Sequence, residues 1–150
     1  MSIVVSGIYV GGRIITELLE RDLIIRSITA TNTKICGMLS EYFYGEELFR
    51  MSLEKLDIRH KLEVIESFIH SLPNSDTETS TVLIALHGIE DISVRIHDEL
   101  DRIKKKIQDH KLKYFYWLRT VDITYDLINL EGHVQNLDRR FDLFIKIRKL

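Results

Sequence analysis

The chain has 150 residues, 45% hydrophobic and 29% charged, a composition typical of one globular domain rather than of a disordered or fibrous chain. Its formal net charge is -2, so no overall positive field draws it to DNA or to an anionic membrane. The single cysteine, Cys36, excludes an internal disulfide and a four-cysteine zinc site.

The sequence contains few targeting signals and few residues that break helices. No basic region precedes the first apolar run, Ile3 to Gly12, and this run is too short for a membrane span of about 20 residues. We therefore expect a protein that is not secreted, has no membrane span, and works inside the cell or within a virus particle. One proline and seven glycines favour long helices. The excess of isoleucine over alanine is typical of AT-rich genomes, including those of large DNA viruses and many protists.

Residues 1–50 allow two interpretations. Ile14, Leu18, Ile25 and Ile28 fit one face of a helix, whereas the β-branched runs at residues 3–5 and 23–25 also suit strands. A short helix is expected from Ile35 to Phe43, stopped by Gly45. We favour a group of short helices for this region, and the sequence leaves open whether residues 1–30 contain strands.

The same N-terminal residues resemble the opening of a Rossmann dinucleotide-binding unit, with an apolar run at residues 3–5, glycines at 7, 11 and 12, and a second apolar run at 23–25. This resemblance implies a small nucleotide-dependent enzyme. The glycine spacing departs from G-x-G-x-x-G, because Tyr9 stands at the second glycine position. We favour the alternative that Ser6, Gly7 and Gly11 form a small-residue face for helix packing.

The middle of the chain predicts one amphipathic helix at about 57–72. We expect Asp57 as its N-cap and Pro73 at its end. Its apolar stripe consists of Ile58, Leu62, Ile65, Ile69 and Leu72, widened by Val64 and Phe68. Residues 73–80 follow as a linker that is rich in turn-forming residues.

Two heptad repeats fill the C-terminal half. The first consists of Val82, Leu86, Ile89, Ser93, Ile96, Leu100, Ile103, Ile107, His110 and Tyr114. The second consists of Ile123, Leu127, Leu130, Val134, Leu137, Phe141 and Phe144. Their registers are one residue out of phase, which places a break near 109–113. The pattern predicts an antiparallel hairpin of helices at about 78–109 and 113–148, and one long bent helix is the alternative.

The predicted fold is therefore all-α, an irregular four-helix bundle that contains this long antiparallel hairpin. We expect one helical domain over 1–150, made of N-terminal helices at 1–72, the linker at 73–80 and the hairpin at 81–150. The hairpin either packs on the other helices or projects from them.

No catalytic constellation stands out. Two pairs place an acidic residue and a histidine three positions apart, Asp57 with His60 and His87 with Glu90. A di-iron bundle requires two E-x-x-H pairs, and the sequence does not contain them. No serine or cysteine lies in a nucleophile motif. We expect neither an enzyme nor a bound metal or cofactor.

The sequence favours a non-catalytic helical structural or interaction subunit of a larger assembly, a homo- or hetero-oligomer, with a minor structural protein of a virus particle as one concrete version. The residues expected to anchor a protein partner are Tyr114, Phe115, Trp117, Leu137, Phe141 and Phe144.

The alternative is a nucleic-acid-binding helical domain that uses the basic stretch at 102–119, where basic side chains adjoin aromatic ones. Its expected contacts are Arg102, Lys104, Lys105, Lys106, Lys111 and Lys113.

Overall fold

The chain forms helices throughout most of its described length. The computed structural model describes residues 2–41, 47–73, 80–113 and 121–149, and it places the side chains of these residues from position 20 onward, except at position 48. The helices in these ranges are α1 (Ser2–Glu41), α2 (Glu47–Leu56), α3 (Ile58–His70), α4 (Ser80–Lys111) and α5 (Thr124–Lys149). These ranges contain no strand, and the predicted all-α fold is confirmed.

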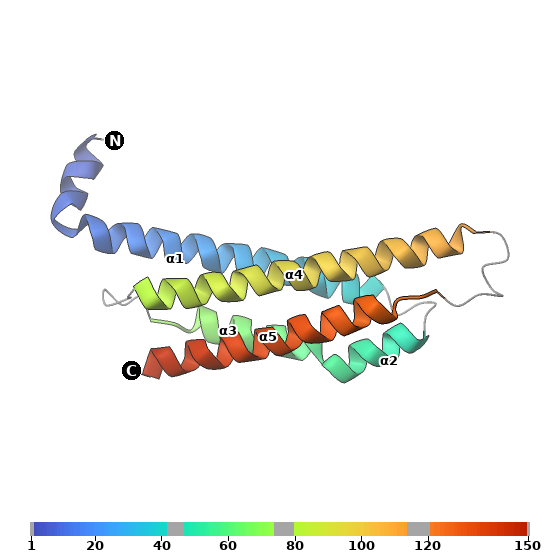
Figure 1. Ribbon diagram of the computed structural model, residues 1–150. Helices are drawn as coiled ribbons and strands as arrows, with labels where there is room; N and C mark the ends of the chain where they lie inside the picture. The colour runs from blue at the N-terminus through green and yellow to red at the C-terminus, as the bar shows by residue number, and fades with distance from the viewer. Residues whose placement is uncertain (1, 42–46, 74–79, 114–120, 150) are drawn as a thin grey trace.

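The helices pack as an irregular four-helix bundle (Figure 1). α1 and α4 lie side by side in the same direction, and α5 returns antiparallel to α4. Lys106 Nζ contacts Asp126 Oδ2 at 2.6 Å near one end of the α4–α5 pair, and Arg140 Nη1 donates to the Gly88 carbonyl oxygen at 2.6 Å near the other. The predicted hairpin is therefore present, and it packs on the other helices.

The short helices α2 and α3 follow one another and together occupy the fourth position of the bundle (Figure 1). α3 lies antiparallel to α1, because Arg21 Nη1 donates to the Pro73 carbonyl oxygen at 2.9 Å while Arg59 Nη2 donates to that of Cys36 at 3.1 Å. On its other side α3 meets α5, where the Phe68 ring lies edge-on to Phe141 and Phe144, with centroids 5.5 and 5.8 Å apart.

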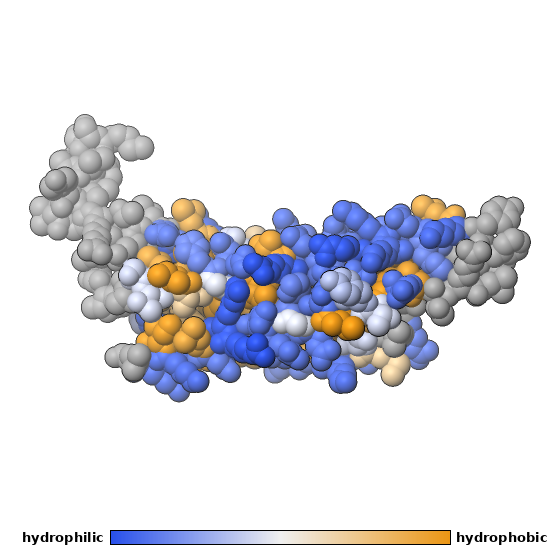
Figure 2. Space-filling view, in the orientation of Figure 1, coloured by the Kyte–Doolittle hydropathy of each residue, from blue (hydrophilic) through white to orange (hydrophobic). Residues whose placement is uncertain are grey.

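Both predicted heptad repeats face the interior of the chain. All members of the first repeat from Val82 to His110 are buried. In the second, Leu127 and Phe141 are half-buried and the other members are buried. Burial of apolar side chains is the main stabilising term in such a bundle. The exterior is mostly hydrophilic, with separate hydrophobic groups on the face that Figure 2 shows.

The N-terminal prediction needs correction, because α1 is one helix of 40 residues rather than a group of short helices. Its buried residues Ile24, Ile28, Ile35, Met38 and Leu39 recur at helical spacing, and no proline interrupts them. The apolar runs at 3–5 and 23–25 are helical, and Gly7, Gly11 and Gly12 lie within α1, so the strand–turn–helix interpretation is wrong. Tyr42, Phe43 and Gly45 lie outside the described residues.

The second helix of the hairpin begins later than predicted, at Thr124 rather than near 113. Asp122 Oδ1 accepts a hydrogen bond from the Thr124 amide at 3.3 Å, and the Leu127 amide donates to the Ile123 carbonyl oxygen at 2.9 Å. This local turn starts α5 at the first residues of the second heptad repeat. The predicted break after α4 is confirmed, because α4 ends at Lys111.

The helix predicted at 57–72 is α3, and α2 before it was missed. Asp57 lies between them at the N-cap position of α3, as predicted, with φ 53° and ψ 41°, but its side chain makes no capping hydrogen bond. Its amide instead donates to the Leu53 carbonyl oxygen at 3.1 Å. The backbone of Asp57 therefore adopts the left-handed conformation just after the end of α2, at a position that favours glycine.

This backbone geometry predicts the effect of substitutions at Asp57. Asp57→Gly should raise the free energy of unfolding by up to about 1 kcal/mol, because glycine adopts a positive φ without a Cβ clash. Asp57→Val should lower the free energy of unfolding by about 1–2 kcal/mol. Urea unfolding followed by circular dichroism checks both values, and a glycine variant less stable than the valine variant would contradict the assignment.

Candidate functional site

The predicted partner anchors divide into two groups. Tyr114, Phe115 and Trp117 lie outside the described residues. Leu137 and Phe144 are fully buried, and Phe141 is half-buried against Phe68. These three residues on α5 therefore belong to the chain's own core, and a partner surface requires other side chains.

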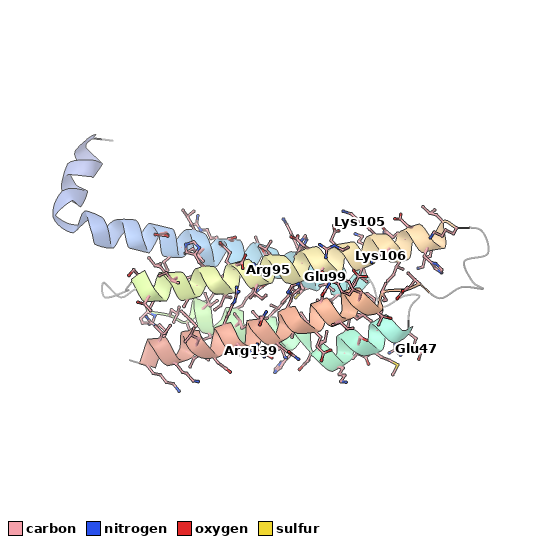
Figure 3. All side chains as sticks on the ribbon, in the orientation of Figure 1. Glu47, Arg95, Glu99, Lys105, Lys106 and Arg139 are labelled. Atoms are coloured by element: carbon pink, nitrogen blue, oxygen red, sulfur yellow. The ribbon has the colours of Figure 1, made fainter. Side chains whose placement is uncertain are left out.

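Acidic side chains of the same chain pair with three basic residues of α4, which are Arg102, Lys105 and Lys106. Figure 3 labels the two lysines near the C-terminal part of this helix. Lys105 Nζ lies 2.9 Å from Asp101 Oδ2, one helical turn away. Arg102 pairs with Glu99, and Lys106 pairs with Asp126 on α5. Glu99 lies three residues before Arg102 and Asp101 lies four residues before Lys105, and these spacings in the sequence favour ion pairs on a helix.

The other predicted nucleic-acid contacts also lie near the end of α4. Lys104 is half-buried, whereas Lys111 and Lys113 are exposed. Lys104 and Lys111 both take part in polar or electrostatic interactions. The basic side chains of α4 therefore do not form a continuous stripe of unpaired positive charge.

A buried carboxyl pair lies between α4 and α5. Glu99 and Asp126 are each 2% exposed, and each is bonded to a cation at the rim, Arg102 and Lys106 respectively. Burying a carboxylate disfavours its charged form. Accordingly, burial raises the pKa of Glu99, Arg102 opposes this shift, and a hydrogen bond with Asp126 raises the pKa further.

Neighbouring cations affect a second titratable group in the same seam. Burial lowers the pKa of His133 on α5, and the positive charges of Arg95 and Arg102 on α4 lower it further. The imidazole therefore favours its neutral form. Glu99 and His133 are thus two groups between α4 and α5 whose pKa values are shifted in the direction that favours the uncharged form.

The raised pKa of Glu99 predicts a pH-dependent contribution to stability. This contribution is present below the pKa of the unfolded chain and is lost as the pH rises through the folded-state pKa. Glu99→Gln keeps an uncharged side chain at all pH values. Its free energy of unfolding relative to the wild type should therefore rise from pH 4 to pH 7, by about 1.4 kcal/mol for each unit by which folding raises the pKa.

Urea titrations at several pH values measure this difference, to which the His133 titration contributes equally in both proteins. Glu63→Gln, at an exposed position on α3, is the matched control and should show a much smaller pH-dependent difference. A Glu99→Gln variant whose relative stability falls towards neutral pH would contradict the assignment.

Polar groups also lie along α1, some of them in contact with α3. Thr29 Oγ1 lies 3.1 Å from His70 Nε2, and both amide atoms of the buried Asn32 lack a hydrogen-bond partner among the described residues. Burial raises the pKa of the Cys36 thiol, and the Arg59 charge only partly opposes this. A thiol with a raised pKa is a poor nucleophile at neutral pH.

The described residues contain no group of three or more His, Cys, Asp or Glu side chains that could hold a metal ion. His87 Nε2 lies 3.1 Å from Glu20 Oε1, and its Nδ1 lies 3.6 Å from Glu90 Oε1. The His87 side chain is half-exposed and joins α1 to α4 as a surface contact.

A groove of about 430 Å³ lies between α2, the start of α3 and the N-terminal half of α5; we call it the α2–α5 groove. It is lined by Ser52, Lys55, Leu56, Lys61, Thr124, Leu127, Ile128, Glu131, Val134 and Gln135. Lys61 pairs with Asp138 at 2.8 Å, whereas Lys55 and Glu131 form no ion pair within the described ranges. This groove could not be predicted from the sequence without α2, which forms one of its walls.

Several large apolar side chains outside the core are exposed. Ile128 in the α2–α5 groove is 61% exposed. The others are Leu23, Met51, Val64, Ile84, Val94, Leu112, Tyr125 and Leu143. In the part of the chain whose side chains are placed, no helix is long and apolar enough to cross a membrane.

Comparison with known proteins gives one informative relative. No protein-family model matches the chain, and no solved structure matches it. The chain is similar to "Uncharacterized protein L717" of Acanthamoeba polyphaga mimivirus, with 26% identity over 161 aligned residues. The alignment covers 89% of this chain and 78% of that protein. A viral protein is thus among its relatives, in line with the compositional hint of a large DNA virus.

Proposed function

We propose that the chain is a non-catalytic helical structural or interaction subunit of a larger protein assembly, and that this assembly is viral. The observation that carries the proposal is the α2–α5 groove, where apolar lining residues and the exposed Ile128 lie between charged rims. Grooves between helices are a common docking site for a partner helix. The similarity to a mimivirus protein supports the viral part of the proposal.

The packing of both heptad repeats against helices of the same chain also supports the α2–α5 groove as the surface for a partner. The heptad positions of α4 and α5 are mostly buried against other helices of the same chain, so they are not available to a partner. Apolar groups outside the core therefore remain as the groups that can contact other proteins. Exposed apolar groups that adjoin a hollow are typical of such contacts.

Nucleic-acid binding is the weaker candidate. Arg102, Lys105 and Lys106 already contact carboxylates of the same chain. Each phosphate contact would have to compete with one of these ion pairs. Acidic neighbours also repel the phosphate backbone.

We therefore predict no saturable binding of single- or double-stranded oligonucleotides, even at about 50 mM salt, where electrostatic binding is strong. Fluorescence anisotropy with labelled oligonucleotides measures this directly. Binding that weakens steeply with salt, and is lost on combined reversal of Lys104, Lys105 and Lys106 to Glu, would favour the nucleic-acid alternative.

The assembly proposal is tested in extracts of the cells that produce the protein. In a density gradient, the chain should sediment in a complex far larger than its own 17.7 kDa, and the complex should survive nuclease and high salt. Sedimentation as the free chain would contradict the proposal. Collapse of the complex after nuclease treatment would also contradict it.

A further inference from the structure

We propose that the α2–α5 groove is a self-association surface, in which the same face of a second copy of this chain docks across a two-fold axis. The inference rests on the proposed function and names one partner for it. A two-fold contact brings one patch against itself, so the patch must be complementary to itself. The α2–α5 groove has this property in both its charge and its shape.

The charge of the groove is balanced between two different helices. Lys55 lies on α2 and Glu131 on α5, and neither forms an ion pair within the described ranges. A two-fold axis that sets Lys55 opposite Glu131 of the partner subunit also creates the reciprocal contact. Both rim charges would then be paired, and the pairing would fix the orientation of the two chains.

The shape of the groove supplies both a projection and a hollow. Ile128 is 61% exposed and lies beside the half-buried Leu56 and Leu127. In a two-fold contact, Ile128 of each chain enters the hollow of the other and becomes buried. Burial of an apolar side chain stabilises association, and the two-fold symmetry supplies this contribution twice.

The size of the surface sets the expected strength. The groove has ten lining residues, whereas a stable interface of standard size uses about 20–30 residues on each side. A tight dimer is therefore not expected. We expect a dimer with a dissociation constant of about 1–100 μM, which depends on the concentration of the purified chain.

Charge reversal provides a sharp test in the purified full chain. Lys55→Glu and Glu131→Lys each place like charges across the two-fold axis and should shift the protein to monomer. The double variant exchanges the two charges and should restore the dimer. Ile128→Glu should abolish the dimer. Sedimentation equilibrium over about 1–300 μM gives the dissociation constants, a range that brackets the expected value.

Matched controls lie on other faces of the bundle. Leu23→Glu changes an equally exposed apolar residue on α1, and Lys34→Glu reverses an exposed lysine on the same helix. Both controls should keep the wild-type dissociation constant, and circular dichroism should show wild-type helicity for every variant. A wild-type monomer throughout the range, or a double variant that stays monomeric, would overturn the inference.

The two proposals fail separately. A monomeric purified chain that still sediments in a large nuclease-resistant complex overturns the self-association surface and leaves the assembly role. A purified dimer that is restored by the double charge exchange, but sediments in cell extracts only as a dimer, supports the surface and overturns the larger assembly.

Discussion

The burial of the apolar face of α4 against α1 and α5 is the constraint on which the rest of the structure depends. α4 has 32 residues, and its buried positions continue from Val82 to His110. Each fully buried leucine or isoleucine contributes about 1.5–3 kcal/mol relative to an exposed one. The hairpin cannot project as a free arm without exposing this face to water. Because it folds back instead, α1, α3 and α5 surround one core, and surfaces for other proteins are restricted to the exterior.

Polar groups within the same seam fix how the helices align. Glu99 and Asp126 are buried and are each held by one cation, which stabilises one register of α4 against α5. Ser93 interrupts the first heptad repeat, is fully buried, and its hydroxyl has no partner among the described residues. Buried polar groups of this kind lower stability, and in coiled coils they specify register. In this chain, apolar burial supplies the stability and the paired charges supply the alignment.

The sequence predicted those parts of the fold in which a periodic pattern and its burial coincide. Most members of the repeats in α4 and α5 are buried as expected, and so are Ile58, Leu62, Ile65 and Ile69 on α3, whereas Val64, which was expected to widen that stripe, is exposed. The start of α5 was misplaced because a heptad pattern does not by itself mark the first residue of a helix. The helix begins where the Asp122 carboxylate accepts a hydrogen bond from the Thr124 amide. α2 was missed although five of its ten residues are apolar, because ten residues make fewer than three helical turns and so repeat the pattern too few times. The α2–α5 groove depends on α2 and on contacts between distant segments, so no local pattern could reveal it. The β-branched runs in α1 were ambiguous because helix packing overrides their strand preference.

The central claim, that the apolar seam of α4 closes within one chain, is tested most directly by distance measurement with spin labels. Labels on cysteines introduced at the exposed positions Val94 on α4 and Asp142 on α5, with Cys36 replaced by serine, report the separation of the two helices by pulsed electron paramagnetic resonance. We predict that the short α4–α5 distance persists when labelled protein is refolded with a large excess of unlabelled protein, because both labels belong to one bundle. Loss of that distance on dilution would show that the seam forms between chains and would contradict the account.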